Sequence, residues 1–223
     1  MPGAIANCML MAGELPPLVD ARTNAPADDA FAQLVARAAA GDTAAFEQVI
    51  IATERKVVAT AWRMLGNRED ARDAAQEIFL RVYKYLHRYR AGQDFHGWLY
   101  RITLNVCHDI ARQRQRAGMD WRREASPAFA EDRNLPESLT SCGDAEESVL
   151  LNQQSAVLAR ALQTLPEKER AALILRDLEE LPTAEVARIL RSRPVTIRTQ
   201  VSSARRKLKL YCERWVKRGG RNV

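Results

Sequence analysis

Apolar side chains recur along the first half of this chain at the spacing of an amphipathic α-helix. Residues 28–65 contain two such runs, and Gly41 and Asp42 separate them. Asp42 suits the N-cap of the second run, because its short carboxylate accepts from free backbone N–H groups. We therefore predict two consecutive helices over these residues.

The next stretch predicts two further helices. Gly66 fits a left-handed cap, and Asn67 fits the N-cap of a helix over residues 68–90, with Asp70 in a capping-box-like role. A fourth helix is expected from near Trp98 to residue 116, after a loop that begins at residue 90. A single Trp at helical spacing is usually a core residue, so we assign Trp98 to the core.

Residues 181–209 have the pattern of two short helices joined by an Arg-rich turn. The first is predicted from about 182 to 190, and Pro194 suits the first turn of the second. One face of the second helix is apolar and consists of Ile197, Val201, Ala204 and Leu208. The face away from it carries Thr196, Thr199, Ser202, Ser203 and Arg206, flanked by Arg198 and Lys209. No acidic residue occurs from 191 to 211, so this pattern favours a helix-turn-helix that reads DNA over a merely solvated face.

Charge divides the chain into blocks. Residues 31–116 carry 14 basic and 9 acidic side chains, and residues 151–223 carry 16 and 7. Between them, residues 117–150 carry only 3 basic side chains against 8 acidic ones and have little periodicity. We predict an all-α fold of two small helical domains, 28–116 and 151–216, joined by the acidic flexible linker 117–150. A disordered N-terminal tail (1–27) and a basic tail (217–223) complete the division.

The remaining composition argues against several classes of protein. The cysteines at 8, 107, 142 and 212 are scattered and have no metal-ligand spacing, and the three histidines have no nucleophile to activate. No phosphate-cradling glycine loop or pair of catalytic carboxylates occurs, so we expect neither an enzyme nor a metal or other cofactor. No apolar run has the roughly 20 residues of a membrane span, and residues 1–18 make a poor signal peptide, so we expect a cytoplasmic protein without membrane insertion.

A row of carboxylates lies beside the apolar stripe of the third predicted helix. Asp70, Asp73 and Glu77 follow one another at i, i+3 and i+7, with Gln76 and Leu80 nearby. Such a row suits docking to a basic partner. The alternative is that acids in the first turn merely stabilise the helix dipole, which explains Asp70 and Asp73 but not Glu77.

The loop before the fourth helix and the helix itself carry groups that can hold an unstacked base. These are the aromatic rings of Tyr89 and Phe95, the amide of Asn105 and the surrounding arginines. Phe95 fits a core position equally well.

The two basic blocks together resemble the extracytoplasmic-function group of bacterial sigma-70 factors. In the first block the motifs are GDTAAF (41–46), LGNREDARDAAQEIFLRVYKYL (65–86) and FHGWLYRITLNVCHDIARQRQR (95–116). In the second they are ALQTLPEKERAALILRDLEELP (161–182) and the helix-turn-helix. The resemblance covers about residues 28–116 and 156–210.

The resemblance implies a sigma factor that binds RNA polymerase core and directs promoter-specific initiation. The first domain would meet the clamp helices through Asp70, Asp73, Gln76, Glu77 and Leu80. The residues implied at the minus-ten element are Tyr89, Arg90, Gln93, Phe95, Arg101, Asn105 and Arg112. Those implied at the minus-thirty-five element are Arg193, Thr196, Arg198, Thr199, Ser202, Ser203, Arg205 and Arg206. The second domain would also meet the polymerase flap, and an anti-sigma factor is an expected partner.

Three features depart from the family pattern. Arg193 stands where the family usually has a small N-cap residue, most often Ser. Arg191 stands where the turn usually has Gly, so we expect this turn to be built differently. Arg198-Thr199-Gln200 replaces the usual Lys-Ser-Arg, which predicts a different base preference.

Two other functions stay open at this stage. One is a helix-turn-helix regulator that acts without polymerase. The other is a sigma-like decoy that sequesters an anti-sigma factor. The carboxylate row argues against a regulator that acts without polymerase. The basic charge of residues 151–223 argues against a decoy.

Overall fold

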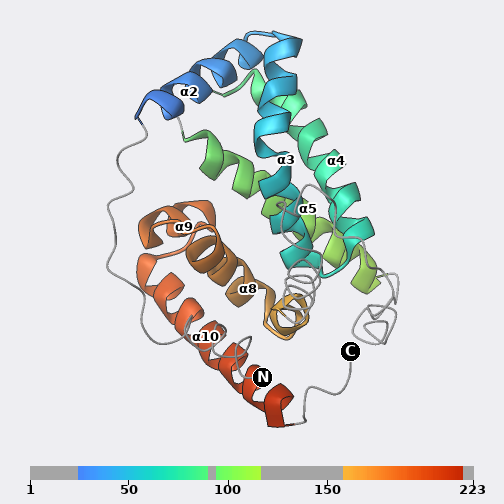
Figure 1. The fold of residues 1–223 in the computed structure, drawn as a ribbon, viewed down its shortest axis with the longest axis vertical. Helices are drawn as coiled ribbons and strands as arrows, with labels where there is room; N and C mark the ends of the chain where they lie inside the picture. The colour runs from blue at the N-terminus through green and yellow to red at the C-terminus, as the bar shows by residue number, and fades with distance from the viewer. Residues whose placement is uncertain (1–24, 90–93, 117–157, 218–223) are drawn as a thin grey trace, which may run out of the picture.

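The computed structural model describes residues 25–89, 94–116 and 158–217, and every regular element in these ranges is helical (Figure 1). The first group of helices comprises α2 (Ala25–Ala39), α3 (Thr43–Leu65), α4 (Arg68–Leu86) and α5 (Phe95–Arg116). The second comprises the helical residues 158–163, α8 (Glu167–Leu173), the π-helical turn η3 (Ile174–Leu178), α9 (Thr183–Ile189) and α10 (Pro194–Lys217). The all-α prediction is confirmed. The predicted disordered tail was 1–27, but residues 25–27 already belong to α2, so that boundary is corrected. Residues 1–24, the linker 117–150, the first residues of the second predicted domain (151–157) and residues 218–223 lie outside the described ranges.

Local capping chemistry fixes the boundaries of α3 and α4. The Asp42 carboxylate accepts a 3.0 Å hydrogen bond from the N–H of Ala45, and the Asn67 side chain accepts one of 2.8 Å from Glu69. Both N-caps are confirmed. Gly66 has φ 73°, and its N–H donates to the carbonyl of Trp62. These residues therefore end α3 and start α4 as the sequence predicts.

The start of α5 differs from the prediction. The helix begins at Phe95 rather than near Trp98, because the Asp94 carboxylate caps it by accepting a 2.9 Å hydrogen bond from the N–H of Gly97. Trp98 lies within the first turns and packs against the core, as expected.

The turn between α9 and α10 keeps the left-handed conformation although it lacks glycine. Arg191 has φ 50°, and the next residue, Ser192, donates its N–H to the carbonyl of Ala187 at 2.9 Å. Our expectation of a differently built turn is therefore wrong. The backbone keeps its path and Arg191 bears the conformational strain, which costs a residue with a Cβ about 1 kcal/mol.

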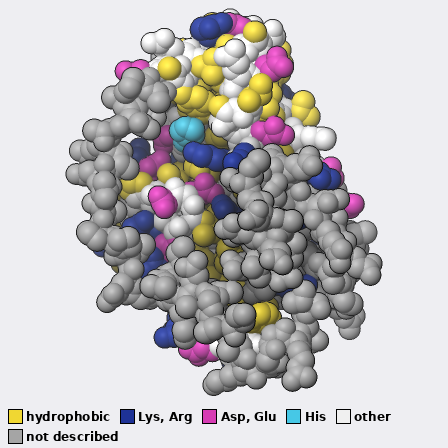
Figure 2. All heavy atoms as spheres, in the orientation of Figure 1, with side chains coloured by type: hydrophobic (Ala, Val, Ile, Leu, Met, Phe, Trp, Pro, Cys, Tyr) yellow, Lys and Arg dark blue, Asp and Glu magenta, His cyan; other side chains and the backbone are white. Residues whose placement is uncertain are grey.

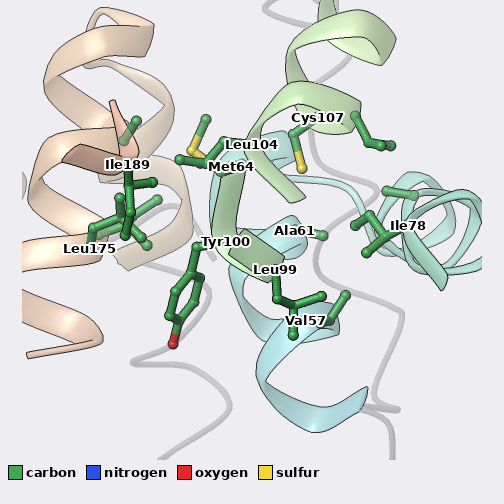
Figure 3. Packing of buried hydrophobic residues seen from close by; sticks show 14 of the residues in the cluster. Val57, Ala61, Met64, Ile78, Leu99, Tyr100, Leu104, Cys107, Leu175 and Ile189 are labelled. Atoms are coloured by element: carbon green, nitrogen blue, oxygen red, sulfur yellow. The ribbon is translucent and has the colours of Figure 1, made fainter. Parts of the chain in front are cut away.

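The two groups of helices pack against each other through one continuous cluster of buried apolar side chains. Met64 and Leu104, from α3 and α5, face Leu175 and Ile189 from the second group (Figure 3). All four are buried, at 8% exposure or less. Two predicted modules are thus held together by a shared core in this arrangement.

Candidate nucleic-acid interface

The exposed side of α10 forms a stripe, which we call the outer stripe. Its members follow at steps of four and three residues, so they lie on one line along the helix: Val195, Thr199, Ser202, Arg206 and Lys209. All are exposed, and Thr196 and Arg198 flank them. The opposite face holds the buried Ile197, Val201 and Ala204. The predicted division of this helix into a core face and a free face is confirmed.

Two of the residues predicted to meet DNA are engaged inside the second group instead. The Arg205 guanidinium makes two hydrogen bonds to the Asp177 carboxylate, at 2.8 and 2.7 Å, and this contact raises the pKa of Arg205. Ser203 Oγ donates to Glu169 Oε1 at 3.2 Å, and the same carboxylate accepts from Lys207 at 2.8 Å. In this arrangement Arg205 and Ser203 join α10 to η3 and α8, whereas Arg206 points to solvent. Arg193, just before α10, is exposed.

The predicted minus-ten face of α5 lies against α9. Asn105 and Arg101 line a pocket of about 220 Å³, and its other walls include Ile189 and Arg191 from the second group. Arg101 also donates a 3.1 Å hydrogen bond to the carbonyl of Arg188. Arg112, two turns further along α5, is exposed. The second group of helices therefore covers part of the face that the resemblance assigns to promoter DNA.

Aromatic rings form a cluster at the start of α5. Phe95 is 5% exposed and meets the rings of Phe31, Tyr89 and Trp98 with centroids 5.7 Å away in each case. Phe95 is thus a packing residue in this arrangement, which is the core alternative that the sequence left open, and its contact with a base stays a prediction. Tyr89 is half-buried, and burial raises the pKa of its hydroxyl. Arg90 and Gln93 lie outside the described residues.

The carboxylate row of α4 divides into bound and free members. Asp70 is 8% exposed and pairs with Arg114 of α5, which replaces the capping-box-like role we expected. Burial raises the pKa of Asp70 despite the opposing effect of Arg114. Glu77 pairs with Arg81 at 2.6 Å. Asp73 and Gln76 are exposed.

An apolar surface continues the free part of this row. Leu80 is 65% and Tyr83 59% exposed, and the Tyr83 ring lies 5.1 Å from that of Phe46 on α3. Apolar side chains show between polar ones at the top of the view in Figure 2, where α2, α3 and the end of α4 come together in Figure 1. Asp73, Gln76 and Leu80 are therefore the members of the predicted docking surface that solvent reaches most freely.

Glu179, directly after η3, joins the two groups and was not singled out by the sequence. Its Oε1 accepts hydrogen bonds from Thr60 at 3.0 Å and Arg63 at 2.8 Å, and its Oε2 accepts one of 2.7 Å from the Tyr100 hydroxyl. Only 8% of the Glu179 side chain is exposed. Burial and this carboxylate together raise the pKa of Tyr100 strongly. No local pattern marks such a residue, because its partners precede it by 79 to 119 positions.

A second set of polar contacts crosses the same boundary where α3 ends. Gln163 donates to the Arg63 carbonyl at 3.1 Å, and the buried Arg170 donates to the carbonyl of Met64. Gly66 permits this approach, because a Cβ there would lie 2.7 Å from the Gln163 side chain. These donors satisfy C-terminal carbonyls of α3 that have no partner within the helix.

The described residues offer no other chemical site. They contain no cluster of His, Cys, Asp and Glu able to hold a metal ion, and none of their helices combines the length and apolarity of a membrane span. The Cys107 thiol is buried, and burial raises its pKa to about 12. A thiol in that state is a packing group rather than a nucleophile.

Two family models match this chain. Sigma-70 region 2 matches residues 49–117, and sigma-70 region 4 matches residues 155–208. The first match contains the candidate docking and minus-ten residues of α4 and α5. The second contains the helix-turn-helix.

Full-length relatives agree with these models. The RNA polymerase sigma-H factor of Pseudomonas aeruginosa is 31% identical, over 78% of this chain and 89% of that protein. The factor SigW of Bacillus subtilis is 29% identical, over 76% and 89%. Among solved structures, CnrH in complex with the cytosolic domain of CnrY has a TM-score of 0.58 at 22% identity, covering 82% of this chain and 97% of CnrH. The sigma factor RpoE of Bartonella quintana, in complex with the anti-sigma factor NepR, has a TM-score of 0.55 at 21% sequence identity, covering 74% of this chain and 94% of that chain.

Proposed function

The chain belongs to the extracytoplasmic-function group of the sigma-70 family and is a promoter-directing sigma factor, and on that premise we propose how its two groups of helices share this role. We assign core docking and the minus-ten element to residues 28–116, and the minus-thirty-five element to residues 151–216. The observation that carries this division is the outer stripe of α10, which is exposed along its whole length and free of acids from residue 191 to 211. A separate surface on α4 is acidic and apolar, which suits a protein partner rather than DNA.

Docking to RNA polymerase core uses α4. Asp73, Gln76 and Leu80 form the contact surface, because they are exposed on one side of the helix. Asp70 supports this surface from behind through its pair with Arg114, and Glu77 does so through Arg81. The clamp helices are the partner that the family implies for this surface, and the flap is the partner implied for the second group.

Asn105 and Arg112 are already exposed, but the use of Arg101 at the minus-ten element requires the two groups of helices to separate. Asn105 and Arg101 serve as its base and phosphate contacts, and Arg112 extends the cationic surface along α5. In the closed arrangement Asn105 shares a pocket with Arg191, and Arg101 is bonded to the backbone of α9. Core binding replaces the contacts between the groups and exposes this face, so the free protein binds promoter DNA weakly.

Three further parts of the role follow from the family. The factor itself makes and breaks no covalent bond, because the polymerase performs the chemistry. It acts in the cytoplasm, where the polymerase and the promoters are. An anti-sigma factor binds it, a partner suggested by the two solved relatives, whose complexes contain CnrY and NepR.

Run-off transcription from genomic DNA tests the proposal. Purified core with the full-length protein should give discrete transcripts that core alone does not give. The same protein without core should bind the promoters found in this way only weakly. Tight, specific binding by the free protein without core-dependent transcription would instead identify a regulator that works alone. Binding of neither core nor DNA would identify a decoy.

A further inference from the structure

Val195 is a largely exposed apolar side chain at the start of α10. It is 67% exposed and lies two residues after the turn, in the first turn of the helix. At 100° per residue it stands about 200° from Ile197 and 180° from Ala204, both of which are completely buried. Val195 therefore points directly away from the domain.

Thr199, one turn further along, adds its methyl group to the two of Val195 at this end of the outer stripe. Its hydroxyl donates a 3.1 Å hydrogen bond to the carbonyl of Val195. The proton of this hydroxyl is thus already used inside the helix, and the side chain is held against its own backbone. The N-terminal end of the stripe offers methyl groups, whereas the C-terminal end offers the cations Arg206 and Lys209.

This gradient matches the way a recognition helix enters the major groove. The N-terminal residues of such a helix approach base edges, while residues further along meet the backbone. The 5-methyl group of thymine is the apolar feature of the major-groove edges, and small aliphatic side chains contact it. The cationic side chains at the C-terminal end of the stripe suit contact with DNA phosphates.

We propose that Val195 selects a thymine in the minus-thirty-five element through contact with its 5-methyl group, with the Thr199 methyl completing the contact. The proposal rests on the assignment of that element to α10. Val195 is a specificity-determining residue in this role, whereas Arg206 supplies affinity to any sequence. The wide exposure of Val195 means that its substitution leaves the domain fold intact.

The experiment removes the methyl groups from each side of the contact in turn, two from Val195 and one from the thymine. A library of minus-thirty-five variants, transcribed by holoenzyme, first identifies the preferred thymines on either strand. Each is then replaced singly by deoxyuridine, which keeps base pairing and deletes only the methyl group. Wild type is compared with Val195→Ala and with the matched control Leu210→Ala, another exposed aliphatic side chain of α10 at 46% exposure.

At one thymine we expect deoxyuridine to weaken promoter binding by wild-type holoenzyme about fourfold, the effect of removing one buried methyl group. Val195→Ala should lose a similar factor on the thymine promoter and show no further loss with deoxyuridine at that position. Val195→Ile, which keeps the aliphatic contact, should restore the sensitivity to deoxyuridine. Leu210→Ala should behave as wild type throughout.

Three outcomes overturn the proposal. In the first, the losses of promoter binding caused by Val195→Ala and by deoxyuridine multiply independently at every thymine. In the second, the library selects no thymine. In the third, Val195→Ala reduces core affinity without changing promoter choice. The last outcome would identify Val195 as part of a protein contact. If Arg206→Ala still weakens initiation in these cases, the assignment of α10 to promoter DNA stands and only the role of Val195 fails. If initiation changes neither with Arg206→Ala nor with the minus-thirty-five sequence, the assignment of α10 to promoter DNA fails as well.

Discussion

The Tyr100 hydroxyl donates a 2.7 Å hydrogen bond to the Glu179 carboxylate, which lies 79 residues further along the chain and in the other group of helices. The same carboxylate accepts from Thr60 and Arg63, so one buried acid binds three donors of the first group. Unpaired buried charges are costly, and this carboxylate therefore favours the closed arrangement only while all its partners are in place. Separation of the two groups breaks these bonds together.

Glu179→Ala should open the protein. We expect the closed arrangement to lose about 2–3 kcal/mol, less than for a fully buried pair because the Arg63 side chain is 27% exposed. Energy transfer between fluorescent labels on α4 and α10 measures the separation of the two groups. Promoter binding by the free protein should rise. Glu54→Ala, an exposed acid on α3, is the control. Unchanged energy transfer in the Glu179 variant would show that the two groups stay together without the Glu179 hydrogen bonds.

Glu185 should make closure depend on pH. Burial and the nearby Asp94 carboxylate raise the pKa of Glu185 above its ordinary value of 4.5, against the effect of Arg188. The closed form therefore binds a proton more tightly than the open form. This extra stability is fully present below pH 4.5 and is lost as pH rises through the raised pKa.

Glu185→Gln should remove this dependence and make the closed form more stable at neutral pH. Energy transfer recorded from pH 4 to 7 for wild type, Glu185→Gln and the control Glu54→Gln provides the test. Identical pH profiles for all three proteins would contradict the role of Glu185.

Arg191→Gly should stabilise the protein. Arg191 has φ 50°, a conformation that glycine adopts without strain, so the expected gain in unfolding free energy is about 0.5–1 kcal/mol. Arg188→Gly is the matched control, because the same substitution within α9 should cost about 1 kcal/mol. Denaturant unfolding compares the two variants. A loss of stability in both would mean that the Arg191 side chain contributes more than its backbone strain costs.

Asp73→Ala combined with Leu80→Ala should weaken core binding without unfolding α4. Leu80 is 65% exposed, and burying such a side chain on docking changes affinity by about tenfold or more. Loss of the Asp73 charge should mainly slow association. Circular dichroism and binding kinetics with purified core provide the measurements, and Arg72→Ala on the exposed side of the same helix is the control. Unchanged affinity would leave these residues without a docking role.

Three arginines of α10 should behave differently from one another. Arg198→Ala should alter which minus-thirty-five sequence is preferred, by about 1–3 kcal/mol per lost base contact. Arg206→Ala should weaken all promoters alike and reduce the salt slope by about one unit. Arg205→Ala should leave both properties unchanged and lower stability by about 0.5–1 kcal/mol, since its half-exposed pair with Asp177 is intramolecular. A promoter library transcribed at two salt concentrations separates the three.

The reverse pattern for Arg198 and Arg206 would mean that α10 enters the groove rotated from the orientation of its buried stripe. A reduced salt slope in Arg205→Ala would mean that Arg205 leaves Asp177 when DNA binds.

Sequence reasoning was most accurate where structure depends on neighbours a few residues apart. It predicted the caps Asp42, Gly66 and Asn67 and the buried stripe of α10 correctly. It missed the cap at Asp94, and for that reason it started α5 three residues late. It also predicted that the turn at Arg191 would be built differently. That prediction failed because packing, which the sequence does not display, easily offsets strain of about 1 kcal/mol.

The sequence by itself determined the all-helical fold, the position of the helix-turn-helix and the family, because helical period and capping act within one or two turns. Only the tertiary structure decided which of two similar neighbours is free. Arg205 and Arg206 are adjacent, yet only Arg205 reaches an acid 28 residues away, and Asp70 but not Asp73 meets an arginine 44 residues away. Burial and pairing of these charges depend on how distant helices pack. For the same reason the role of the Glu179 carboxylate could not be predicted from the sequence, because its partners lie in the distant helices α3 and α5.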